Sequence, residues 1–113
     1  MEYHFENIDR VLKVALEGRL VAACSEEFRE LMLERMKKNR LILFDLSGLT
    51  HIDSSGLGAL VALLQKAAAM GGTVKLACLQ PRPRIVFDIT KVYRVFEIFD
   101  TVEAGLNSFP SPA

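Results

Sequence analysis

The sequence predicts an α/β domain with a mixed, mostly parallel sheet, an N-terminal antiparallel hairpin and about four helices packed on the sheet. Three observations predict it. Strand-like and helix-like runs alternate through most of the chain, which is the order that crossover connections of a parallel sheet require. Residues 40–46 are almost all apolar, as in a strand that is covered on both faces. Two alternating runs at the N-terminus are separated by a polar connection, as in a hairpin.

The hairpin is expected from residues 3–8 and residues 11–16, in which apolar and polar side chains alternate. Residues 7–10 are expected to connect the two strands. Glu17 and Gly18 follow the second run, and a glycine in this place favours a turn or a bulge at the strand end.

The first helix is expected over residues 26–38, where apolar residues recur at helical spacing. Ser25 is the expected N-cap, because a serine hydroxyl accepts a bond from a free backbone N–H of the first turn. The central strand is expected at residues 40–46, and residues 47–52 are expected to form a loop. Asp45 is expected to brace this loop through hydrogen bonds, since an unpaired buried carboxylate is costly.

The second helix is expected over residues 54–70, with Gly71 placed for the left-handed residue that ends many helices. Pro83 suits the first position of a short helix, and Thr101 suits the cap of a closing helix. The remaining elements are a strand, the short helix, a last strand and the closing helix, expected at residues 73–79, 84–90, 95–99 and 101–109. The domain is thus expected to span residues 1–109, and residues 110–113 are expected to be a disordered tail.

Composition favours one soluble domain and argues against two classes of partner. The 113 residues carry 14 basic and 14 acidic side chains, so there is no basic excess with which to bind nucleic acid. The longest apolar stretch, residues 57–64, is far shorter than the roughly 20 residues that span a bilayer, so no direct membrane insertion is expected. The N-terminus lacks the basic and then apolar layout of a secretory signal, which favours a cytoplasmic location.

Cysteine and histidine spacing predicts no metal site and no cofactor. Cys24 and Cys78 are far apart and are expected to be buried, reduced thiols. His4 and His51 are not accompanied by a cluster of carboxylates or cysteines with the spacing of metal ligands. A metal held by Asp45 and Asp53 during phosphoryl transfer remains an alternative.

The most informative motif is Asp-Ser-Ser-Gly-Leu-Gly at residues 53–58, which joins the central strand to the second helix. The first turn of a helix has free N–H groups and the positive end of the helix dipole, so a phosphate on a serine there is tolerated. A phosphate adds about 1.5 to 2 negative charges and three acceptor oxygens. Asp and Ser are also good N-cap residues, so local sequence alone leaves open the interpretation that they only cap the helix. Gly56 and Gly58 allow close approach, either of a partner or of the sheet beneath the helix.

A hydrolase is the rival interpretation, because His51, Asp53 and Ser55 supply the residue types of a catalytic triad. A working triad is normally assembled from separated elements, and the G-x-S-x-G elbow is absent. We therefore expect no enzymatic activity.

The motif resembles the signature of the anti-sigma factor antagonists, which are single-domain STAS proteins. Other segments fall where that family has similar residues: Gly18-Arg19-Leu20, residues 44–48, Gly71-Gly72 and residues 95–100. The resemblance implies a STAS-like fold and an anti-anti-sigma function, in which the protein binds an anti-sigma factor serine kinase and a serine phosphatase acts on the phosphorylated form. It implies that Ser55 accepts the phosphate, while Ser54 and Asp53 shape the turn. The partner-binding residues that it implies are Asp53, Ser54, Ser55, Gly56, Leu57 and Gly58.

Two departures from the family pattern keep alternatives open. Val21 stands where these antagonists usually carry an aspartate close to the phosphorylated serine, so the chain is alternatively a constitutive antagonist that is never phosphorylated. Lys91-Val92 replaces a turn that bears a glycine, which concerns helix termination.

A further alternative is a STAS accessory subunit of a membrane lipid transporter. Arg82 and Arg84 are either solvated turn residues or contacts for an acidic partner.

Overall fold

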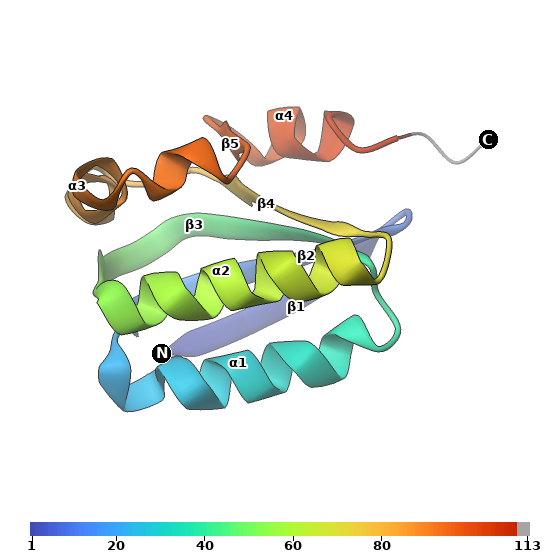
Figure 1. Cartoon of the computed structure of the whole chain (residues 1–113). Helices are drawn as coiled ribbons and strands as arrows, with labels where there is room; N and C mark the ends of the chain where they lie inside the picture. The colour runs from blue at the N-terminus through green and yellow to red at the C-terminus, as the bar shows by residue number, and fades with distance from the viewer. Residues whose placement is uncertain (111–113) are drawn as a thin grey trace.

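Five strands form one sheet in the order β1-β2-β3-β4-β5 in the computed structural model, which describes residues 1–110 (Figure 1). The β1–β2 pair is antiparallel and the other pairs are parallel, which confirms the predicted mixed sheet with its N-terminal hairpin. The strands are β1 (Glu2–Ile8), β2 (Val11–Leu20), β3 (Leu41–Ile52), β4 (Thr73–Ala77) and β5 (Ile98–Phe99). Of the expected tail, residues 111–113 lie outside the described residues.

Helices cover both faces of this sheet. They are α1 (Ala22–Met36), α2 (Ser54–Ala69), α3 (Pro81–Thr90) and α4 (Val102–Asn107), with a short 3-10 turn, η1 (Val92–Arg94), after α3. The long helices α1 and α2 lie side by side along the sheet (Figure 1). Their starts therefore meet at one end of the sheet.

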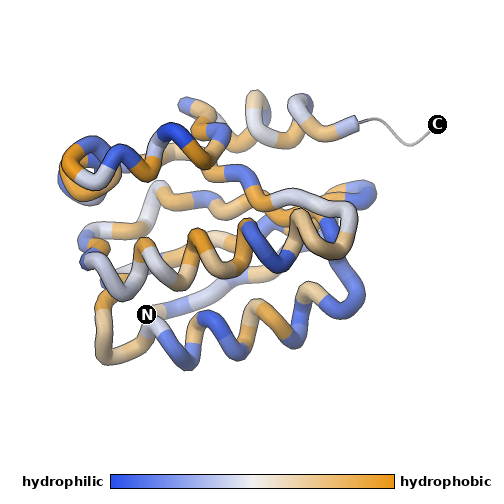
Figure 2. The backbone as a smooth tube through the Cα atoms, viewed as in Figure 1, coloured by the Kyte–Doolittle hydropathy of each residue, from blue (hydrophilic) through white to orange (hydrophobic). Residues whose placement is uncertain are grey.

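Side chains along β3 point alternately to the two faces of the sheet, and each face has its own part of the hydrophobic core. Phe44 and Phe28, from β3 and α1, are fully buried with their ring centroids 5.6 Å apart. Leu43 points to the other face and packs with Phe109 and Ala77 beneath α4. Along α1, hydrophobic and hydrophilic segments alternate, as expected for a helix with one buried side (Figure 2).

Strands β2 and β3 are longer than expected, and the two differences have one cause. The chain stays paired with β3 up to the match of Leu20 with Ile52, past two register shifts, one between Ala15 and Glu17 and one between Gly18 and Arg19. Gly18 has a φ of 111°, a conformation that an L side chain rarely adopts. The expected loop at residues 47–52 is therefore a strand. Asp45 does accept a hydrogen bond from the Ser47 N–H at 3.0 Å, as the bracing role requires.

Two helices begin earlier than expected. Helix α1 begins at Ala22, with Val21 at the N-cap, so the expected cap at Ser25 is wrong. Helix α3 begins at Pro81 rather than Arg84, because two prolines in the first turn remove only N–H groups that have no helical partner.

The C-terminal elements follow the expected order, but both strands and the closing helix are shorter than expected. Strand β4 ends at Ala77 rather than at residue 79, and α4 ends at Asn107 rather than at residue 109. The last strand, expected over residues 95–99, is paired only at Ile98 and Phe99. Gly71 has the expected left-handed φ of 78°, and the Thr101 hydroxyl caps α4 through the Ala104 N–H at 3.0 Å. Lys91 ends α3 with a φ of 60°, a left-handed conformation that a glycine would adopt without strain.

Candidate functional site

The serine turn, residues 53–58, connects the end of β3 to the first turns of α2 (Figure 1, left end of α2). Asp53 is extended, with φ of −117° and ψ of −175°, and is the N-cap residue of α2. Ser54 and Ser55 are the first two residues of the helix. The turn thus lies where backbone N–H groups without helical partners point out of a helix start.

Both carboxylate oxygens of Asp53 accept backbone hydrogen bonds, and the two bonds join different helices. Oδ1 accepts from the Gly56 N–H at 2.9 Å, in the first turn of α2. Oδ2 accepts from the Ala22 N–H at 2.9 Å, at the first residue of α1. These bonds, that from Gly56 foremost, lower the pKa of Asp53 below its ordinary value. An ionised carboxylate therefore holds two helix starts together beneath the serines.

Both serines are exposed to solvent, and they border different hollows. Ser55 lines a hollow of about 290 Å³ between α1 and α2, whose other lining residues include Glu26 and Arg29. Ser54 lines a groove of about 330 Å³ between α2 and η1. The Ser55 hydroxyl is therefore open to a visiting protein.

The two glycines of the turn have different roles. A β-carbon on Gly56 would lie 2.2 Å from the Leu20 carbonyl oxygen and 2.9 Å from Cγ1 of Ile52. A β-carbon on Gly58 would meet nothing within 4 Å. Gly56 thus permits close packing of α2 on the end of β2, and only Gly58 leaves open space on the surface.

Leu57 and Gly56 are buried, although the sequence groups them with the surface residues of the motif. Leu57 is 4% exposed and belongs to the core beneath α2. The surface of the serine turn is therefore made by Ser54, Ser55 and Gly58, with Asp53 half-buried beside them.

His51, Asp53 and Ser55 do not form the hydrogen-bond chain of a triad. The His51 Nδ1 lies 2.9 Å from the Thr50 hydroxyl, and its Nε2 lies 3.1 Å from Nη1 of Arg82. Both carboxylate oxygens of Asp53 are occupied by backbone N–H groups. Both nitrogens of the ring are thus engaged away from Ser55.

The cysteines are free, and both are half-buried rather than fully buried. Burial raises the pKa of the Cys78 thiol, and the nearby Asp45 carboxylate adds to this rise. Cys24 donates to the Arg19 carbonyl oxygen at 3.2 Å.

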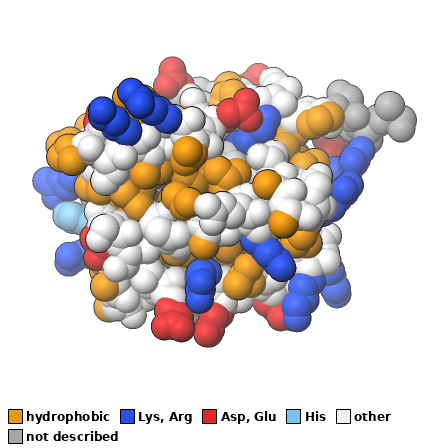
Figure 3. All heavy atoms as spheres, viewed as in Figure 1, with side chains coloured by type: hydrophobic (Ala, Val, Ile, Leu, Met, Phe, Trp, Pro, Cys, Tyr) orange, Lys and Arg blue, Asp and Glu red, His pale blue; other side chains and the backbone are white. Residues whose placement is uncertain are grey.

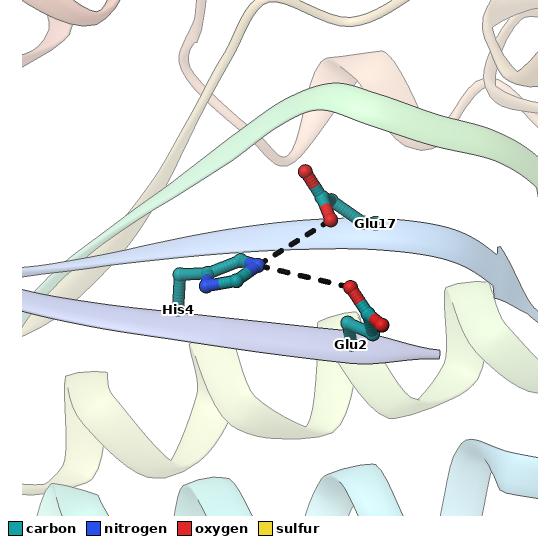
Figure 4. Close-up of side chains that lie close together, drawn as sticks. All are labelled: Glu2, His4 and Glu17. Carbon is teal, nitrogen blue, oxygen red and sulfur yellow. Dashed lines mark hydrogen bonds and ion pairs between the residues drawn. The ribbon is translucent and has the colours of Figure 1, made fainter.

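Among residues 1–110, the one group of side chains with ligand atoms close enough for a metal is Glu2, His4 and Glu17 (Figure 4). Nε2 of His4 lies 3.3 Å from Glu17 and 4.0 Å from Glu2. No spacing in the sequence indicates this group, because Glu17 faces Glu2 only through the antiparallel pairing of β1 and β2. All three side chains are exposed, and the group does not include Asp45 or Asp53.

Sequence reasoning also missed an exposed apolar surface on the outer side of α3 and η1. We call it the apolar ridge, and its residues are Ile85, Ile89, Tyr93 and Val95. The available signal was the pair Ile85 and Ile89, four positions apart in a helix whose opposite side buries Phe87.

Comparison with known proteins gives consistent results. The family model of the STAS domain matches residues 3–105. BtrV of Bordetella bronchiseptica, which carries the name of an anti-sigma factor antagonist, is 28% identical over 110 residues, covering 96% of this chain and 95% of that protein.

Two solved proteins have the same fold. A crystal structure from Thermotoga maritima, also named as an anti-sigma factor antagonist, superposes with a TM-score of 0.87 at 22% identity, over 93% of this chain and 92% of that one. The Bacillus anti-sigma factor antagonist SpoIIAA superposes with a TM-score of 0.81 in its unphosphorylated form, at 21% identity over 94% of each chain. Its phosphorylated form gives a TM-score of 0.72, at 21% identity over 94% of this chain and 97% of that one. Within residues 1–110, none of the helices has both the length and the apolar character needed to cross a membrane.

Proposed function

Since the chain belongs to the STAS domain family, whose model matches residues 3–105, we propose that it is an anti-sigma factor antagonist. In this proposal, the serine turn with unmodified Ser55 binds an anti-sigma factor that is also a serine kinase, and the sigma factor is released. Phosphorylation of Ser55 ends the binding. The names of BtrV and SpoIIAA, and the existence of a phosphorylated form of SpoIIAA, support the proposal.

The observation that carries the proposal is an exposed hydroxyl on a turn that does not depend on it. Asp53, and not either serine, caps α2 and joins it to α1. Ser55 is exposed, and its modification removes no hydrogen bond from this arrangement. The fold can therefore present the same turn in two charge states.

The switch itself is a phosphoryl transfer. The Ser55 oxygen attacks the γ-phosphorus of ATP held by the partner kinase, the bond to the β-phosphate oxygen breaks, and ADP leaves. The hydroxyl proton passes to a base of the kinase. A separate phosphatase reverses the modification by hydrolysis, which releases inorganic phosphate and restores the hydroxyl. This chain is the substrate in both steps.

The new charge would weaken binding for an electrostatic reason. The phosphate would join the ionised Asp53 and the neighbouring Glu26 on a surface that the partner must desolvate. Arg29 in the same hollow and the free N–H groups of α2 offset part of this charge within the chain. A loss of only about 2.8 kcal/mol lowers the affinity a hundredfold.

The test is the affinity of the cognate anti-sigma factor for the wild type, Ser55→Ala, Ser55→Asp and the matched control Ser54→Asp, by titration calorimetry. We expect the wild type and Ser55→Ala to bind alike and Ser55→Asp to bind at least tenfold more weakly. Ser54→Asp places the same charge beside the other hollow and should have the smaller effect. Equal affinities for Ser55→Asp and the wild type would refute the switch.

Val21 allows a second experiment, on the phosphorylation step alone. Intact mass after incubation with the kinase and ATP should rise by one phosphate for the wild type and by none for Ser55→Ala. A wild type that binds tightly but gains no phosphate would identify a constitutive antagonist. Restoration of phosphorylation in Val21→Asp would then assign the difference to that residue.

A further inference from the structure

The apolar ridge is exposed to an unusual degree for large hydrophobic side chains. Ile85 is 57% exposed, Ile89 76%, Tyr93 42% and Val95 56%, and among residues 1–110 no other large hydrophobic side chain belongs to this exposed class. All four fall within eleven consecutive positions. Exposed large apolar side chains that gather in one segment in this way mark an interaction site more often than single scattered ones do.

The segment that carries the ridge lies beside the groove between α2 and η1, which Ser54 of the serine turn also lines. Thr90 and Val92 from the ridge side, and Ser54, Leu57 and Val61 from α2, line this groove. In the space-filling view, hydrophobic side chains gather between the α3–η1 segment and α2 (Figure 3). One partner can therefore contact the serine turn and the ridge together.

The segment that carries the ridge is basic, although the chain as a whole has no net charge. Residues 81–96 hold one carboxylate, Asp88, and four basic side chains: Arg82, Arg84, Lys91 and Arg94. Within the described part of the chain, none of these four basic groups makes an ion pair. Arg82 and Arg84 donate instead to His51 and to the Leu79 carbonyl oxygen. Four cations without a matching anion favour an acidic partner surface.

We propose that the groove and the apolar ridge together bind an amphipathic helix of the anti-sigma factor, with apolar residues on one side and acidic residues along the flanks. A helix fits because its apolar side chains recur every three or four residues on one side, and this side can fill the groove beside the ridge. An apolar and basic surface could also bind a lipid bilayer, but a bilayer surface cannot enter the groove between α2 and η1. This inference rests on the proposed function, and it adds a second contact that is independent of the state of Ser55.

The test uses the double variant Ile85→Ser/Ile89→Ser, whose side chains are exposed and contribute little to the fold. Its matched control is Met70→Ser, a half-buried apolar side chain at the far end of α2. We expect calorimetry with the cognate anti-sigma factor to show at least a tenfold loss of affinity for the double variant and less than a twofold change for the control. Circular dichroism and thermal unfolding should match the wild type for both.

The identity of the bound segment is tested by hydrogen exchange of the complex. Protection should fall on α3 and η1 of this chain and on one helix of the partner that carries acidic residues. Lys91→Glu/Arg94→Glu should slow association at low salt, and the difference from the wild type should shrink as salt is added.

The outcomes separate the two proposals. Weaker binding by Ser55→Asp together with unchanged binding by the double variant would leave the proposed function standing and overturn the ridge. No binding of the wild type to any anti-sigma factor would refute the proposed function and the helix with it. Sedimentation of the wild type, but not of the double variant, with anionic phospholipid vesicles would reassign the ridge to a membrane surface.

Discussion

The two long helices begin side by side at the same end of the sheet, yet only α2 has a cap from its own sequence. Asp53 precedes α2 and accepts a hydrogen bond from the Gly56 N–H. Val21 precedes α1 and has no side-chain acceptor to offer. The free N–H of Ala22 is satisfied instead by the second oxygen of Asp53.

One carboxylate thus serves two helices: it caps α2 by local sequence and α1 through the fold. Gly56 makes this possible, because only a residue without a β-carbon lets α2 approach the Leu20 carbonyl oxygen just before α1. The serine turn is thus fixed from below by Asp53 and Gly56, which leaves its serines free. Substitutions at the two helix starts test this shared cap.

Gly56→Ala should have the largest effect, because the new β-carbon would overlap a backbone oxygen that cannot move aside. We expect the free energy of unfolding to fall by about 3 kcal/mol or more, at the upper end for overpacking. The matched control is Gly58→Ala, which meets open space and should stabilise the helix by about 0.5–1 kcal/mol. Urea unfolding measures both, and similar stabilities for the two variants would contradict the close approach of α2 to Leu20.

Asp53→Ala should cost about 2 kcal/mol, because two helix starts lose their acceptor and a single cap contributes roughly 0.5–2 kcal/mol. Asp53→Asn keeps one acceptor oxygen and should lose about half as much. Thr101→Ala, which removes a cap of one helix only, is the reference for a single cap. If Asp53→Ala costs no more than Thr101→Ala in urea unfolding, Asp53 does not serve both helices.

The contribution of the Asp53 charge should depend on pH. Its pKa is lowered in the folded state, so its stabilisation is fully present above the unfolded value of about 3.8 and is lost as the pH falls through the folded value. The stability difference between the wild type and Asp53→Asn should therefore be constant between roughly pH 6 and 8 and shrink below about pH 4. Unfolding midpoints across this range measure it. The difference between the wild type and Thr101→Ala should stay constant with pH, since no charge is removed there.

Ser25→Ala should have the smallest effect, although Ser25 has the local sequence of a helix cap. Its hydroxyl donates to the Ala22 carbonyl oxygen at 3.4 Å within α1 and caps no N–H group of the helix start. We expect a change within about 0.5 kcal/mol in urea unfolding. A loss of about 1 kcal/mol would mean that α1 begins at Ser25 in solution.

The strand bounds predicted from the sequence are furthest from the structure where two distant segments pair. Neither the end of β2 nor residues 47–52 has a strong strand pattern, and each is a strand because the other is beside it. Such pairing is decided by contacts across the sheet and not by local preference. By contrast, Gly71 and Thr101 act at positions where a single residue sets the local backbone or cap, and both were predicted.

Periodicity and caps act over a few residues, so local sequence sets the mixed α/β order of the elements, the start of α2 and the place of Ser55 at that start. Only packing brings Asp53 to the start of α1, joins Glu2, His4 and Glu17, and places Thr90 and Val92 across a groove from Ser54. The physical reason is distance along the chain. Groups separated by tens of residues are brought together only when the sheet pairs and the helices pack on it, and no local pattern records which of them will then touch.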